Sequence, residues 1–233
     1  MPSETGSRHF LERFSDPQAM AQYEEGVRRF VPALDALHRM AGILLAERVR
    51  QGGKILVLGA GGGLEARALA KAYPDWSFVG VDPAQQMLDL AERTLGPLAS
   101  RVEFVTGTIE DAPEGPFDGA TCLLTLHFLD ARARQQTAEA IRRRLRPGAP
   151  LVVAHSSFPQ GEGERHHWLA RYAAYAKASG ADPGDAENAR AAVAASLDLC
   201  NPEKDAGILS AAGFQGVSLF FAAFTWRGWV GYA

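Results

Sequence analysis

Residues 54–63 read Lys-Ile-Leu-Val-Leu-Gly-Ala-Gly-Gly-Gly, an apolar run that passes directly into a glycine-rich turn. The apolar run predicts a strand buried on both faces, and the Ala- and Leu-rich residues 64–72 predict a helix. Glycines let the main chain turn sharply and lie close to a ligand, and the N–H groups at a helix start can bind an anionic group. This stretch therefore predicts a strand–turn–helix unit with a ligand site at the turn.

Strands and helices are predicted to alternate along most of the chain. Further strands are expected at 76–81, 102–105, 120–126, 151–154, 217–224 and 229–232, with helices at 84–95, 131–145 and 203–212. Alternation at this spacing predicts an α/β fold with a mostly parallel sheet. The last two strands are joined by only a few residues around Arg227-Gly228, so this pair is expected to be antiparallel.

Two segments stand outside this alternation. Residues 16–50 are expected to form N-terminal helices that begin at Asp16-Pro17 and break near Val31-Pro32. Residues 158–200 interrupt the rhythm and are expected to form two helices, inserted as a lid between sheet elements. Residues 1–233 together are expected to form a single domain.

Composition and charge narrow the classes of partner. A formal net charge of -3 does not favour nucleic acid or anionic lipid, and the Arg142–Arg146 cluster suits the end of a helix, so RNA is the less favoured partner. Cys122 and Cys200 lie far apart without metal-ligand spacing, so no disulfide and no metal site are expected. Residues 1–6 lack the pattern of a signal peptide, and no apolar run approaches the roughly 20 residues of a membrane span. The expected location is the cytoplasm, without a membrane partner.

An acidic residue stands where a nucleoside site needs one. Asp82 ends the second predicted strand, 23 residues after Gly59, and from there a carboxylate can accept hydrogen bonds from a ribose diol. Asp82 can also cap the helix that begins near Ala84, and both roles can hold at once. A dinucleotide site needs G-x-G-x-x-G, whose third glycine would fall at Leu64, so a nucleotide dehydrogenase is disfavoured. The pattern present is G-x-G-x-G, at Gly59, Gly61 and Gly63.

That pattern resembles motif I of the class I S-adenosylmethionine (SAM)-dependent methyltransferases, V-L-D-L-G-x-G-x-G. Further segments resemble family motifs in the same order: Asp82-Pro-Ala-Gln-Gln-Met87-Leu, Gly107-Thr108-Ile109-Glu110-Asp111, Leu145-Arg-Pro-Gly148 and Ala212-Gly213-Phe214. The resemblance implies a Rossmann-like sheet of about seven strands with the last one antiparallel. It also implies SAM as cofactor and S-adenosylhomocysteine as product.

The resemblance further implies which residues would bind the cofactor. Asp82 would hold the ribose hydroxyls, Met87 and Ile109 would sandwich the adenine, and Thr108 would lie near its amino group. The remaining implied cofactor-binding residues are Gly59, Ala60, Gly61, Gly63, Pro83 and Leu124. Two positions depart from the family: Val57 replaces the usual acidic residue of motif I, and Thr108 replaces the usual aspartate. A non-catalytic SAM-binding protein is therefore one alternative function.

Three segments resemble the carboxy-SAM synthase branch, which serves wobble-uridine modification in tRNA and uses prephenate: Arg29-Phe-Val31-Pro32, Leu124-Thr-Leu-His-Phe-Leu129 and Ala212-Gly213-Phe214. That chemistry needs a cation to hold the added carboxylate. The family's arginine falls on Ile208, its tyrosine on Leu34 and its asparagine on Leu123. An apolar side chain cannot pair with a carboxylate, so methyl transfer is preferred and the carboxy-SAM synthase reaction is the alternative.

Methyl transfer needs orientation, a dry pocket and sometimes a base, without a covalent nucleophile. His127 follows the fourth predicted strand and His155 follows the fifth, so these two are the candidate catalytic bases. Each can equally be a packed core histidine. The acceptor is expected to be a small molecule that enters from the lid side, and a homodimer is left open.

Overall fold

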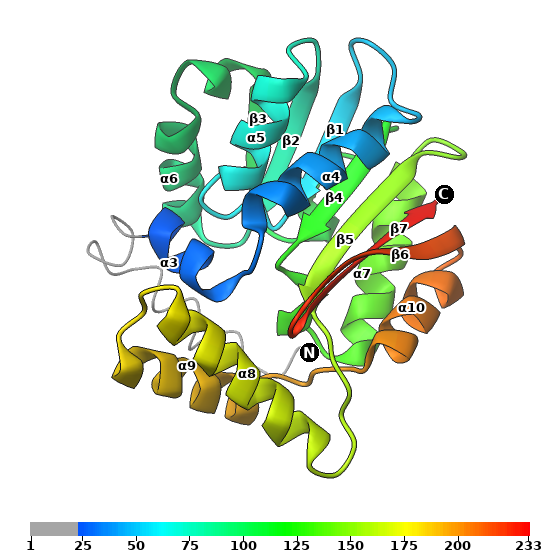
Figure 1. The fold of residues 1–233 in the computed structure, drawn as a ribbon. Helices are drawn as coiled ribbons and strands as arrows, with labels where there is room; N and C mark the ends of the chain where they lie inside the picture. The colour runs from blue at the N-terminus through cyan, green and yellow to red at the C-terminus, as the bar shows by residue number, and fades with distance from the viewer. Residues whose placement is uncertain (1–22) are drawn as a thin grey trace.

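Within residues 23–233, which the computed structural model describes, seven strands form one sheet (Figure 1). The strands are β1 (Lys54–Leu58), β2 (Ser77–Asp82), β3 (Val102–Thr106), β4 (Gly119–Leu123), β5 (Pro150–Ser156), β6 (Gln215–Ala223) and β7 (Trp226–Tyr232). Their spatial order is β3-β2-β1-β4-β5-β7-β6. β7 runs antiparallel to both β5 and β6, whereas the pairs among β1 to β5 are parallel. The predicted α/β fold and antiparallel last pair are confirmed.

Helices cover both faces of this sheet. On one face lie α4 (Leu34–Ala46), α5 (Leu64–Ala72) and α6 (Gln85–Leu95), and on the other lie α7 (Ala131–Arg144) and α10 (Pro202–Ala211) (Figure 1). Successive residues of β1 enter the two cores in turn: Ile55 and Val57 join one, and Leu56 and Leu58 join the other. The unbroken apolar run of β1 is therefore explained by burial on both faces.

Short 3₁₀ helices follow three of the other elements. They are η1 (Gly96–Arg101), η2 (Ile109–Asp111) and η3 (Leu126–Phe128). Because η2 follows β3 and η3 follows β4, both lie at the carboxyl edge of the parallel strands. In a sheet of this kind, ligands bind at that edge.

Three helices lie beyond this edge of the sheet, as Figure 1 shows: α3 (Tyr23–Phe30), α8 (Glu164–Ala178) and α9 (Pro183–Ser196). The predicted break near Val31-Pro32 separates α3 from α4, while the predicted helix start at Asp16-Pro17 lies outside the described residues. The two predicted helices of the 158–200 segment are present. They pack on α3, where Phe30 and Tyr172 place their ring centroids 5.4 Å apart.

Three predicted boundaries were wrong. β4 ends at Leu123 and not at Leu126, because Leu124 turns into the left-handed region at φ 58 and the chain continues as η3. The last hairpin turns at Phe224-Thr225, where Phe224 has φ 50, so Arg227-Gly228 lies inside β7. The N-terminal helices expected to extend to residue 50 end at Ala46. Within residues 23–233, no helix is both long and apolar enough to cross a bilayer.

Candidate cofactor site

The glycine turn after β1 needs glycine at the two positions that face the pocket. Gly59 and Gly61 both have positive φ, at 75° and 48°, a region that costs other residues energy. A Cβ on Gly59 would collide with the Thr125 side chain, and one on Gly61 would meet the Tyr23 hydroxyl at 3.1 Å. The N–H groups of Gly59 and Ala60 donate to the Val81 carbonyl at 2.8 and 3.0 Å. The turn is thus held against the end of β2.

Asp82 joins the turn to the next helix. Its Oδ2 accepts a hydrogen bond from the Gly61 N–H at 2.9 Å, and its Oδ1 accepts one from the Ala84 N–H at 3.0 Å. Burial raises the pKa of the Asp82 carboxyl, while these two backbone hydrogen bonds oppose the shift. The hydrogen bond from Ala84 agrees with the expectation that Asp82 caps the start of α6. Each carboxylate oxygen retains an acceptor site for a ligand hydroxyl.

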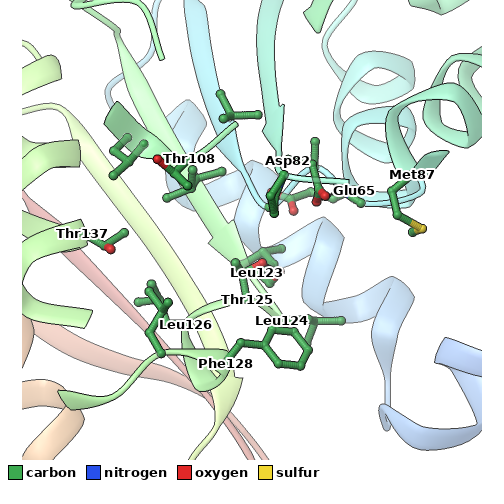
Figure 2. Close-up of a pocket in the computed structure, with 18 of the residues that line it drawn as sticks. Glu65, Asp82, Met87, Thr108, Leu123, Leu124, Thr125, Leu126, Phe128 and Thr137 are labelled. Atoms are coloured by element: carbon green, nitrogen blue, oxygen red, sulfur yellow. Dashed lines mark hydrogen bonds between the residues drawn. The ribbon is translucent and has the colours of Figure 1, made fainter. Parts of the chain in front are cut away.

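A pocket of about 550 Å³ opens beside the turn and Asp82, within the range of small-molecule sites. Figure 2 shows Asp82 and Glu65 and the side chains of the Leu123–Phe128 segment around this space. Of the residues implied to bind the cofactor, those that line the pocket are Gly59, Ala60, Gly61, Asp82, Pro83, Met87, Thr108, Ile109 and Leu124. Nine of the ten residues implied to bind the cofactor therefore lie in the wall of one pocket.

Gly63 does not line the pocket. It starts α5 at φ 79, and a Cβ there would lie 2.8 Å from the Ala91 Cα. Its glycine is required because α5 and α6 pack closely. The implied cofactor-binding role of Gly63 stays a prediction, and its lack of a side chain lets α5 and α6 pack closely behind the site.

Met87, Ile109 and Thr108 lie toward the β3 side of the pocket. Met87 and Ile109 are buried and apolar, which suits the faces of a purine ring. Thr108 caps η2: its hydroxyl accepts from the Glu110 N–H at 3.4 Å, and its own N–H donates to Asp111 at 2.8 Å. The Asp111 carboxylate is thus occupied within the chain.

The two histidines expected to act as bases lie outside the pocket wall. His127 is buried in η3 with its ring centroid 5.5 Å from that of Trp226, and burial lowers its pKa well below the usual value. His155 is buried at the end of β5, with Nε2 3.3 Å from Asp205 Oδ2. Neither lines the pocket, so their predicted contact with an acceptor has no support in this geometry.

Sequence reasoning missed Tyr23 and two buried ionisable residues that line the pocket, His38 and Glu65. Burial lowers the pKa of His38 to about 4 and raises the pKa of Glu65 to about 8. Each is only 6% exposed. A usable signal was present: His38 lies on the apolar stripe of α4 between Leu34 and Ala41, and Glu65 lies one turn before Leu69 of α5. A titratable residue on the buried stripe of a helix costs energy unless it has a partner or a function.

The Arg142–Arg146 cluster does not form one basic patch. Arg144 is buried and donates to the Ala112 and Ala140 carbonyls, while Arg146 pairs with Asp118 at 3.2 Å. Arg142 and Arg143 remain exposed in the last turn of α7. The helix-end interpretation fits this arrangement.

Comparison with known proteins agrees with the fold. Residues 55–148, which contain the glycine turn, Asp82 and the Thr108 segment, match the family model described as a methyltransferase domain. Residues 55–148 thus belong to a methyltransferase domain. The fold and the enzyme class implied by the sequence motifs are confirmed.

Individual relatives place this methyltransferase near two groups. It is 28% identical to the carboxy-S-adenosyl-L-methionine synthase of Chromohalobacter salexigens over 210 residues, which cover 88% of this chain and 78% of that protein. An O-methyltransferase family protein of Burkholderia thailandensis superposes with a TM-score of 0.70 at 17% identity, over 100% of this chain and 64% of the other. Human N-acetylserotonin methyltransferase in complex with SAM superposes at 0.57 and 16% identity, over 96% of this chain and 61% of the other. The chain thus spans about three fifths of these solved chains.

Proposed function

We propose that this methyltransferase transfers the methyl group of SAM to a small-molecule acceptor in the pocket described above. The observation that carries the proposal is the convergence of the Gly59–Gly61 turn and the Asp82 carboxylate on one pocket with apolar Met87 and Ile109. When bound, SAM supplies the reactive methyl group and the leaving thioether. The chain's own residues bind, orient and exclude water.

The strand order supports an orientation for the cofactor. Asp82 ends β2, and Met87, Thr108 and Ile109 follow β2 and β3, so an adenosine held by Asp82 extends toward β3. The other side of the turn faces β4, the neighbour of β1. The amino-acid portion and the methyl group would therefore lie toward Glu65, residues 123–126 and Phe128, all in the pocket wall.

The acceptor end of this pocket is largely apolar. Val27, Leu34 and Phe128 contribute to its wall, and no lysine or arginine among residues 23–233 lines the pocket. A neutral acceptor with an O–H or N–H group fits this wall better than an anionic one. His38 is uncharged at neutral pH, since burial lowers its pKa to about 4, so its imidazole can accept a hydrogen bond from such a group and is only a weak base.

The contacts of the 158–200 insertion support its role as a lid. Phe128 of the pocket wall packs against the cluster of Phe158, Leu169, Leu197 and Leu199. Movement of the insertion would thereby be transmitted to the acceptor end. Both cysteines are free and buried, which supports a reducing compartment such as the cytoplasm.

Asp82→Ala is expected to weaken S-adenosylhomocysteine binding by about 1–3 kcal/mol, because the ligand's ribose hydroxyls and the turn lose a charged acceptor. Titration calorimetry on the full chain measures the change. Asp89→Ala, on the exposed face of α6, serves as a control that should bind normally. An unchanged affinity of the Asp82 variant would remove the ribose assignment.

Carboxy-SAM synthesis is the second candidate, because relatives of that name match most of the chain. Against it, the Leu34 and Leu123 positions in the pocket wall are apolar, and the described wall holds no cation for the added carboxylate. The protein incubated with SAM and prephenate is therefore expected to form no carboxymethyl nucleoside. Mass spectrometry of the extracted ligand checks this, and a product heavier by a carboxyl group would establish the second candidate.

A further inference from the structure

Glu65 lies where the amino-acid portion of the cofactor would be placed. It belongs to the first turn of α5, directly after the glycine turn, and lines the pocket. The Thr121 hydroxyl of β4 lies close to its carboxyl group. Thr121 is in turn the register partner of Val57 in β1. The carboxyl group therefore lies over the boundary between β1 and β4, away from the adenine side.

The carboxyl group of Glu65 is buried without a matching cation. The residue is 6% exposed, its Oε1 has no hydrogen-bond partner in the described structure, and none of the ion pairs found includes it. An ionised carboxylate in such a place is costly, and burial accordingly raises its pKa to about 8. A structural role would be filled better by an apolar side chain. Figure 2 shows Glu65 close to Asp82 among the residues that line the pocket.

The residue at position 57 indicates which group of the ligand Glu65 would bind. Motif I ordinarily has an acidic residue there, and this chain has Val57, buried in the core that also includes Leu64. We infer that Glu65 replaces this missing acidic residue and binds the ammonium group of the SAM methionine portion from α5. This inference rests on the proposed function. It removes one of the two departures that suggested a non-catalytic protein.

Ligand binding would change the protonation of Glu65. The free protein holds Glu65 largely protonated at neutral pH, whereas a carboxylate paired with an ammonium group is ionised. Binding therefore releases the Glu65 proton to the buffer as the carboxylate–ammonium pair forms. A residue that merely packs beside the turn would release none.

The test measures binding and proton release by titration calorimetry at pH about 7, in buffers of different ionisation enthalpy. The probes are S-adenosylhomocysteine and 5′-methylthioadenosine, which lacks the amino-acid portion. Wild type is expected to release about one proton with S-adenosylhomocysteine and none with 5′-methylthioadenosine. Glu65→Gln is expected to abolish the release and weaken S-adenosylhomocysteine about tenfold to hundredfold, with 5′-methylthioadenosine unaffected.

Glu92→Gln, on the exposed side of α6, is the matched control and should behave as wild type. If Glu65→Gln binds S-adenosylhomocysteine with wild-type affinity and proton release, the assignment of Glu65 is overturned while SAM binding stands. If wild type binds neither nucleoside, the proposed function fails first. A loss of affinity for both nucleosides alike would also overturn the inference, since it would mean general damage to the pocket.

Discussion

Arg134→Met is expected to lower the free energy of unfolding by about 3–5 kcal/mol, the cost of breaking a buried ion pair from one side. The Arg134 side chain is fully buried, and its Nη1 donates to Asp205 Oδ1 at 2.7 Å. Methionine fills much of the volume but leaves the Asp205 carboxylate without its arginine partner. Chemical denaturation of the wild type and the variant measures the difference.

The same guanidinium also holds backbone segments together, which is a reason to expect an effect on binding as well. Its Nε donates to the Leu126 and Leu129 carbonyls at 3.0 and 2.9 Å, and its Nη2 donates to the Asp198 carbonyl at 2.7 Å. Leu126 and Leu129 line the pocket, and Asp198 ends the insertion. Loss of Arg134 should therefore weaken S-adenosylhomocysteine binding too.

Two further variants distinguish the loss of this buried ion pair from the loss of an arginine at the protein surface. Arg190→Met removes an exposed pair with Glu187 and should change stability little, because exposed pairs contribute little. Arg134→Met combined with Asp205→Leu should recover part of the loss, since no unpaired carboxylate remains. Equal stability losses for Arg134→Met and Arg190→Met would contradict the prediction.

The fold was predictable because its signals are local. β1 and α5 were predicted with their observed bounds, since a both-faces-buried strand, a glycine turn and an Ala/Leu helix follow one another at 54–72. The strand predicted at 120–126 ran too long because apolar residues continue past Leu123. Only the positive φ of Leu124 stops the strand there, and composition does not reveal that.

The cofactor wall was predictable by motif, whereas the catalytic side of the site was not. His127 and His155 follow strands at the correct edge of the sheet, but tertiary packing turns them into the core beside Trp226 and Trp229. His38 comes from a helix distant in sequence and reaches the pocket because α4 packs beside α5. The only sign of such a long-range contact in the local sequence is a polar residue on an otherwise apolar helix face.

Glu65→Gln is expected to stabilise the cofactor-free protein, by an amount that grows as the pH rises from about 5 to about 8. In the unfolded chain Glu65 titrates near 4.5, whereas burial raises its pKa to about 8 in the folded protein. Between these values the unfolded chain gives up a proton that the folded chain keeps, so folding stability falls with rising pH. Because glutamine does not titrate, the folding stability of the variant does not fall with pH through this group.

The size of the gain follows from the same pKa values. At about 1.4 kcal/mol for each pKa unit, the upper limit near pH 8 is about 5 kcal/mol, with little difference below pH about 5. Denaturation of both proteins across this range checks it, and a difference independent of pH would count against the buried carboxylate. Saturating S-adenosylhomocysteine should narrow the difference at neutral pH by about 1.4–2.8 kcal/mol, the equivalent of the tenfold to hundredfold weaker binding of the variant, because a ligand that binds the folded state more tightly stabilises it more. The ammonium group of the bound nucleoside neutralises the Glu65 carboxylate, which gives a reason for this chain to keep a residue that destabilises the free protein.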